Sequence, residues 1–307
     1  MPPAVADRRS PSPRAAGFGL GRLPAQGLFV MGALSQYVGS AFAVKLFASV
    51  PAAGVAWLRV LSAAVALVAW RRPWRSAWTV RRACLVAAFG GALALMNLCF
   101  YLAIARLPLG TAVAIEFAGP IAVAALGSRT RRDLGALALA TVGVLALADV
   151  HLSGSPGGVA LALAAGALWS GYIVLGHRVA ADPGIRPQDG LAAAMAFGAL
   201  ALAPALAGPA TPALTDPALL GACVLVGLAA SVVPYALEQL AMRRLPRARF
   251  ALLLSLLPAT AAVVGAIILG QVPSVLEAAG IALVVVASSL RSHEDEPLSA
   301  AEGAPGR

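Results

Sequence analysis

Residues 109–127 read LGTAVAIEFAGPIAVAALG, an apolar run of 19 residues with one carboxylate, Glu116, near its centre. A run of this length is typical of a helix that crosses the hydrocarbon core of a membrane. An ionised side chain at the centre of such a helix costs about 2.5–3.5 kcal/mol on insertion scales, so it normally faces a bundle interior or a wet cavity. The run therefore predicts a membrane helix packed in a bundle, with Glu116 turned inward.

The composition of the whole chain agrees with a membrane bundle. Hydrophobic residues make up 60% of the 307 residues and charged residues only 12%, and the mean hydropathy is +0.85. Soluble domains carry about 25% charged residues. The net charge of +10 does not indicate nucleic-acid binding, because the basic residues lie between apolar runs rather than along one face.

Ten apolar runs are long enough to be spanning segments, and their length and lack of strict alternation favour helices over barrel strands. The predicted fold is an all-α polytopic membrane protein. Residues 1–25 are expected to form a disordered basic tail, and residues 291–307 a polar C-terminal tail. The predicted spans are 26–47, 53–70, 83–105, 109–127, 134–150, 157–178, 188–206, 218–241, 250–269 and 274–290.

The distribution of basic residues predicts the orientation. With the N-terminus in the cytoplasm, the cytoplasmic segments hold 20 of the 23 basic residues, whereas the opposite side holds only Arg106. Cytoplasmic loops of membrane proteins carry this excess of Lys and Arg. Both termini are therefore expected in the cytoplasm.

An internal repeat relates the two halves, 26–150 and 157–290. Leu107-Pro108 and Pro120 recur as Leu245-Pro246 and Pro258, each 138 positions later. Five spans separate the copies, so the two five-helix halves have opposite orientations. Inverted repeats of this kind are the usual basis of alternating access in transporters.

Four ionisable residues lie in or at the ends of the spans: Lys45, Arg59, Glu116 and Glu238. Glu116 is the candidate coupling acid, with a structural ion pair as the alternative. Arg59 is the candidate anchor for a carboxylate, since guanidinium groups bind carboxylates in bidentate fashion; an interhelical salt bridge is the alternative. Glu238 is open between a structural and a functional role. Lys45 is a further candidate for substrate binding or coupling; because it ends its helix, the alternative is that its side chain extends to the interface.

Aromatic and amide side chains accompany these charges and suggest a polar cavity among otherwise Ala- and Leu-rich helices. They are Gln36, Tyr37, Asn97, Tyr101, Trp169, Tyr172, Tyr235 and Gln239.

Signals of a soluble enzyme are missing from the sequence. The three histidines, His151, His177 and His293, lie at predicted helix ends or in the tail. No metal-spaced His/Cys set, nucleophile elbow, P-loop or dinucleotide fingerprint occurs in a suitable context. We expect no enzymatic activity, no cofactor and no metal site.

Four stretches carry a resemblance to a known family: residues 96–129, 166–178, 232–246 and 256–271. They resemble the EamA-type ten-helix exporters of the drug/metabolite transporter superfamily, in particular the threonine/homoserine exporter branch. The resemblance covers about residues 26–290. It implies two inverted five-helix repeats, a central cavity, a bacterial cytoplasmic-membrane location, and export of amino acids or similar metabolites, with protons as the exchanged ion.

Six residues match positions that are polar or aromatic in that branch: Lys45, Arg59, Glu116, Trp169, Tyr172 and Glu238. Two positions depart from its pattern. Leu257 stands where the branch carries Glu before Pro258, and Gln271 replaces the Glu of a Leu-Gly-Glu ending. The loss of an intramembrane carboxylate could change the substrate or the coupling stoichiometry.

The sequence thus predicts a secondary transporter that exports small amino acids or related metabolites by proton antiport. Its expected partners are a small-molecule substrate, protons and the lipid bilayer, and a homodimer stays open. An exporter of drugs within the same superfamily, a membrane enzyme and a non-transporting membrane scaffold are the alternatives.

Overall fold

The computed structural model describes residues 24–76, 78–127, 130–152, 155–242 and 244–291, so most of each predicted tail lies outside the described residues. All regular elements in this part are helical. In chain order they are α1 (Ala25–Leu46), α2 (Ala52–Arg71), α3 (Val80–Ile104), α4 (Leu109–Glu116), α5 (Ala118–Gly127), α6 (Arg131–Leu152), α7 (Pro156–Ala181), α8 (Pro187–Thr215), α9 (Pro217–Gly227), α10 (Val233–Met242), α11 (Arg247–Leu254), α12 (Leu257–Leu269) and α13 (Val275–Arg291), with short turns at Pro73–Arg75 and Leu228–Val232.

The helices account for the ten predicted spans. Within the described residues, seven helical segments are long and apolar enough to cross a membrane, and three shorter apolar helices occupy the remaining predicted positions. Four of the predicted spans differ from expectation: one is longer and three are interrupted. The span expected to end at residue 206 continues to Thr215, through three prolines. The single helix expected over 109–127 is interrupted at Phe117.

Proline explains three interruptions in the apolar segments. A proline has no N–H for the carbonyl four residues earlier, and its ring clashes with that carbonyl. Pro120 lies four residues after Glu116, where α4 gives way to α5, and Pro258 lies four residues after Leu254, where α11 ends. In the third segment, Pro234 follows the π-helical turn Leu228–Val232 that separates α9 from α10.

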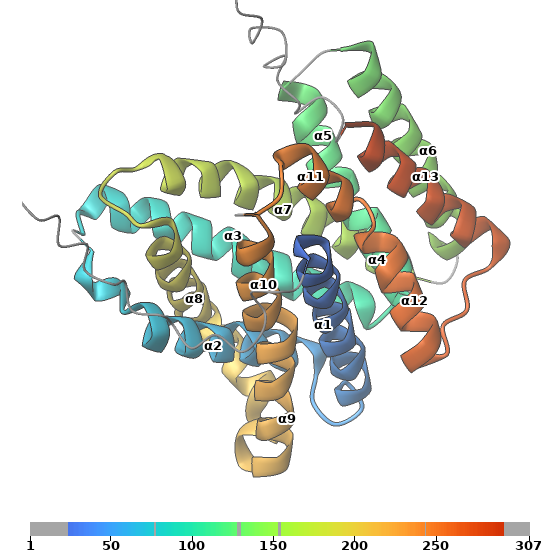
Figure 1. Ribbon diagram of the computed structural model, residues 1–307. Coiled ribbons are helices and arrows are strands. Elements are labelled where there is room, and N and C mark those ends of the chain that lie inside the picture. Colours follow the sequence, from blue (N-terminus) through green and yellow to red (C-terminus); the bar gives the residue numbers. More distant parts are fainter. Residues whose placement is uncertain (1–23, 77, 128–129, 153–154, 243, 292–307) are drawn as a thin grey trace, which may run out of the picture.

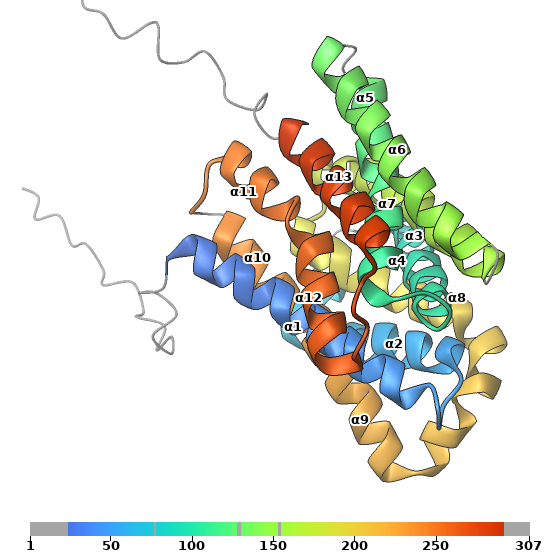
Figure 2. The same cartoon turned by 90° about the vertical axis from the view of Figure 1, so that its right-hand side faces the viewer.

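Equivalent contacts between helices occur in the two halves of the chain. Helix α3 packs on α7 as α1 packs on α10, and α4 and α5 pack on α7 as α12 packs on α1. Three contacts join corresponding segments of the two halves: α2 packs on α8, α6 packs on α13, and the segment formed by α4 and α5 meets the segment formed by α11 and α12 through α4 and α12. The pair formed by α6 and α13 comes last in both halves. Figures 1 and 2 show the last pair side by side at one edge of the bundle.

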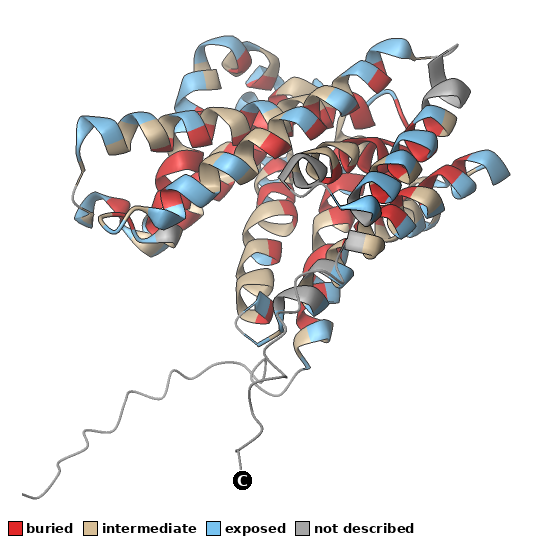
Figure 3. Ribbon diagram, turned by 90° about the horizontal axis from the view of Figure 1, so that it is seen from above, coloured by how far each residue is buried: buried red, intermediate tan, exposed pale blue. Residues whose placement is uncertain are grey.

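Apolar side chains cover the outside of the bundle as well as its interior. Leu225, Ile267 and Val275 are 67%, 78% and 89% exposed. Figure 3 shows the buried residues concentrated on the inward faces of the helices and the exposed ones on the outside. A large exposed apolar surface marks an interaction with another apolar phase, which a lipid bilayer provides.

Candidate functional site

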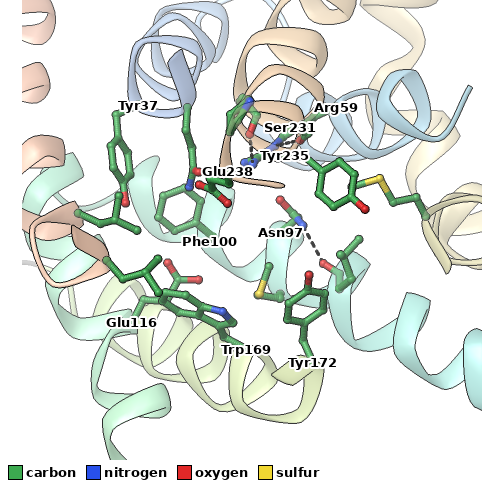
Figure 4. A pocket seen from close by; sticks show the side chains of 18 of the residues that line it. Tyr37, Arg59, Asn97, Phe100, Glu116, Trp169, Tyr172, Ser231, Tyr235 and Glu238 are labelled. Carbon is green, nitrogen blue, oxygen red and sulfur yellow. Dashed lines mark hydrogen bonds between the residues drawn. The ribbon is translucent and has the colours of Figure 1, made fainter. Parts of the chain in front are cut away.

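A cavity of about 220 Å³ lies among the helices of both halves (Figure 4). Its polar and aromatic lining consists of Gln36, Tyr37, Arg59, Asn97, Phe100, Glu116, Phe117, Trp169, Tyr172, Ser231, Tyr235 and Glu238. Leu93, Met96, Leu191, Met195, Ala230, Pro234, Leu254 and Leu257 complete the wall.

The cavity lies where the helices are interrupted. Glu116 and Phe117 stand at the break between α4 and α5, and Leu254 and Leu257 flank the break between α11 and α12. Ser231 belongs to the π-helical turn. In secondary transporters, binding sites are typically formed by discontinuous helices at the interface of the repeats.

Close packing of two glycines positions the first of these breaks. A Cβ added at Gly166 of α7 would lie 2.5 Å from the carbonyl oxygen of Glu116, and one added at Gly119 would collide with the Gly166 carbonyl. Small residues allow helix backbones in membranes to approach this closely. Helix α7 therefore lies directly against the break between α4 and α5 that carries Glu116, and its Trp169 ring packs edge-on against Phe117 with the ring centroids 4.9 Å apart.

Arg59 of α2 is buried and held by neighbouring groups of the π-helical turn. Its Nε donates to the Ser231 hydroxyl and its Nη2 to the Ala230 carbonyl, both at 2.9 Å. The guanidinium carbon lies 5.0 Å from the centre of the Tyr101 ring. The sequence left open a salt bridge to an acid, but within the described residues Arg59 is held by neutral acceptors.

Two carboxylates face the same cavity. Glu116 ends α4 and is 8% exposed, whereas Glu238 is half-buried on α10. Within the described residues, neither carboxylate makes a hydrogen bond or an ion pair. Figure 4 places Glu116 on one side of the cavity, with Glu238, Ser231 and Arg59 on the opposite side. The cavity thus combines one fixed cation with two acids.

The structure brings together most of the candidate residues from the sequence, but not all. Nine candidates line the cavity: Gln36, Tyr37, Arg59, Asn97, Glu116, Trp169, Tyr172, Tyr235 and Glu238. Asn97 also donates to the carbonyl of Leu93, at 2.8 Å, in its own helix.

Three candidates lie elsewhere, and one of them, Gln239 of α10, is half-buried outside the cavity lining. Tyr101 is fully buried beneath Arg59 and contacts the Phe47 and Phe100 rings, so it supports the site without lining the cavity. Lys45 is exposed in the last turn of α1, with its Nζ 5.7 Å from the centre of the Phe42 ring. A lysine at a helix end can keep its charge at the interface, which fits the alternative considered for it.

Sequence reasoning missed Phe117, Met195 and Ser231. The signal for Ser231 was present, because Pro234 follows three residues later and a proline frees the carbonyls of the preceding turn. As for metals, no group of three or more His, Cys, Asp or Glu side chains suited to an ion occurs in the described segments.

A bundle of apolar helices around a polar cavity, with helices interrupted at that cavity, defines a polytopic membrane transporter. The sequence model of the EamA-like transporter family matches residues 156–292. The chain is 36% identical over 257 residues to the threonine/homoserine exporter RhtA of Salmonella typhimurium strain LT2, covering 81% of this chain and 85% of that protein. The exporter of the same name from Escherichia coli K12 is 36% identical over 253 residues, with the same coverage. The chain belongs to the EamA-like transporter family, which confirms the resemblance inferred from its motifs.

One solved crystal structure of a protein has the same fold. The superposition covers 86% of this chain and 96% of the other chain, with a TM-score of 0.50 and 20% sequence identity.

Proposed function

We propose that this protein exports threonine, homoserine or chemically similar small amino acids across a bacterial cytoplasmic membrane. The relatives named above are exporters of threonine and homoserine, and they match along most of the chain. The observation that carries the proposal is the charge pattern of the cavity, with one guanidinium and two carboxylates around a small volume.

This pattern suits a zwitterion. Arg59 would bind the α-carboxylate, because a guanidinium presents a planar pair of donors to two carboxylate oxygens. Glu116 or Glu238 would receive the ammonium group. Asn97 and the Tyr172 and Tyr235 hydroxyls would contact a polar side chain such as the hydroxyl of threonine. The cavity of about 220 Å³ is of the right order for a single small amino acid.

Alternating access is the proposed mechanism. Two five-helix repeats in opposite orientations, residues 26–150 and 157–290, would exchange conformations around the fixed site. The helix breaks after Glu116 and Leu254, 138 positions apart, and the exchangeable packing of the two halves support this. Both termini are proposed to lie in the cytoplasm, because that arrangement puts 20 of the 23 basic residues on the cytoplasmic side. Residues from both halves of a single chain line the cavity.

Proton antiport would drive export through Glu116. Burial disfavours the ionised form of a carboxylic acid, and opening the cavity to water favours it. A proton taken up when the cavity faces outside and released when it faces inside would return the empty carrier. Substrate and proton would compete for the same carboxylate, which couples the two fluxes.

Counterflow in proteoliposomes tests the substrate assignment. Vesicles loaded with unlabelled threonine should take up labelled threonine, and homoserine added outside should compete with it. Ethidium is the matched probe for the alternative of a drug exporter, which the aromatic cavity wall and its two acids also favour. Threonine counterflow supports the proposal. Ethidium flux without threonine flux would replace it with the alternative, and no flux of either would favour a scaffold.

A further inference from the structure

The π-helical turn Leu228–Val232 leaves two backbone carbonyls without their usual donors. In an α-helix the carbonyl of each residue accepts the N–H four residues later. Here the Val233 N–H bonds to the Leu228 carbonyl, five residues back, instead of the Ala229 carbonyl. The expected donor to the Ala230 carbonyl would be residue 234, which is proline and has no N–H.

Side chains from two other helices bind these carbonyls. The Ser35 hydroxyl of α1 donates to the Ala229 carbonyl at 2.8 Å, and Arg59 of α2 donates to the Ala230 carbonyl at 2.9 Å. Helix α1 packs closely enough on the π-helical turn for its side chains to contact these carbonyls. A Cβ added at Gly39 of α1 would lie 3.0 Å from the Ala230 backbone nitrogen. Buried backbone groups require such partners, so the irregular turn and Arg59 satisfy each other.

The same turn supplies a second acceptor to Arg59. The Ser231 hydroxyl, next in sequence to Ala230, accepts from Nε at 2.9 Å. The Nε and Nη2 donors of one edge of the guanidinium are thereby engaged, and the Tyr101 ring lies against its plane. A guanidinium has five N–H donors. Within the part of the chain that the structure describes, three of them remain for a ligand, including the pair at the end of the group.

We propose that the π-helical turn and Ser231 form a clamp that holds Arg59 in the orientation required to bind the carboxylate of the substrate. Ser231 is then a positioning residue, and Pro234 maintains the clamp by withholding an N–H from the Ala230 carbonyl. π-Helical turns occur frequently at functional sites. The clamp rests on the proposed function for the identity of its ligand, but its action on carboxylates can be measured separately.

Binding to the purified full-length protein in nanodiscs tests the clamp. Three probes are used. Threonine carries both a carboxylate and an ammonium group, threoninamide lacks the carboxylate, and acetate consists of a carboxylate and a methyl group. Ser231→Ala removes one acceptor, and Pro234→Ala supplies an N–H that competes for the Ala230 carbonyl. Each should weaken threonine and acetate binding about tenfold, the effect of losing one hydrogen bond to a charged group. Threoninamide affinity should stay within about twofold, because it does not use this hydrogen-bonded cation.

Three variants serve as controls. Ser231→Thr keeps the hydroxyl and should retain the affinity of the unaltered protein. Ser62→Ala removes a hydroxyl that, within the described residues, bonds only to carbonyls of its own helix α2. Pro204→Ala removes a proline inside α8. Both variants should bind threonine normally.

Several outcomes would overturn the clamp. Equal losses for threonine and threoninamide would mean a general structural role, and unchanged threonine binding in both Ser231→Ala and Pro234→Ala would remove the clamp altogether. If the unaltered protein binds acetate but not threonine, and the variants lose acetate, the clamp stands while the proposed substrate fails. If it binds no carboxylate, both fail.

Discussion

Glu116 is the residue on which the proposed coupling depends. Its equivalent 138 positions later is Leu254, which lines the same cavity as an apolar side chain. Leu257, which the resemblance to the exporter branch led us to expect as a carboxylate, also lines it. At this pair of helix breaks the acid is therefore present in only one half, and Glu238 of α10 is the other acid of the cavity.

We predict that Glu116→Gln abolishes transport driven by a pH gradient while threonine exchange survives. The amide keeps the shape and hydrogen bonding of the acid but cannot release a proton. Net uptake and exchange are compared in the same proteoliposomes. Glu277→Gln is the matched control, because Glu277 is a buried acid outside the cavity that caps α13 through the Ser274 N–H, and Gln can fill that role. Undiminished gradient-driven flux in Glu116→Gln would transfer the role to Glu238.

Arg59→Lys should raise the threonine concentration for half-maximal exchange about tenfold, because lysine keeps the charge but loses the planar pair of donors. The maximal exchange rate should change less. Arg106→Lys, on the exposed connection between α3 and α4, should leave both values unchanged. An unaltered apparent affinity in Arg59→Lys would exclude bidentate binding of the carboxylate.

At the scale of helices, the sequence predicted positions better than continuity. The predicted span ended at residue 206, yet α8 continues to Thr215 and includes Pro204, Pro209 and Pro212. Prolines are tolerated in membrane helices, where neighbours re-satisfy the freed backbone groups. The interruption at Phe117 was also unforeseen, although Pro120 had been noticed as part of the repeat. Whether a proline bends, breaks or is absorbed by a helix depends on packing that a single sequence does not display.

For the site as well, the sequence predicted some features and not others. Charged residues such as Glu116 and Arg59 were predictable, since a charge in an apolar helix needs a polar surrounding. Their partners were not. Arg59 and Ser231 lie 172 positions apart and meet only through the packing of α2 on the π-helical turn. Gln271 likewise binds the first N–H of α4, at Leu109, from 162 positions away, at 2.9 Å.

The contact between α5 and α7 provides a stability prediction. Gly119→Ala places a methyl group against the Gly166 backbone and should lower the free energy of unfolding by about 1–3 kcal/mol, as overpacking does. Gly171 lies in α7, as Gly166 does, but faces open space. Gly171→Ala should therefore be neutral or stabilising. Thermal unfolding in detergent compares the two. Equal melting temperatures would mean that α5 and α7 do not approach as closely as described.

At the scale of the whole molecule, the arginine distribution predicts the topology. Reporter fusions should place residue 130 in the cytoplasm and residue 216, between α8 and α9, outside. Both expectations follow from the excess of 20 basic residues on one side over one on the other. The reverse result at both positions would invert the molecule and, with it, the direction of transport.

Gradient-driven flux is the most direct test of the central claim, that this cavity exchanges protons for a small amino acid. Proteoliposomes that are acidic inside are placed in neutral medium with labelled threonine, and internal label is followed with and without a protonophore. The proposed antiport predicts transient accumulation of threonine above its external concentration, which the protonophore abolishes and which is missing from protein-free vesicles. Uptake that only equilibrates, at the same rate with or without the pH gradient, would contradict proton-coupled export.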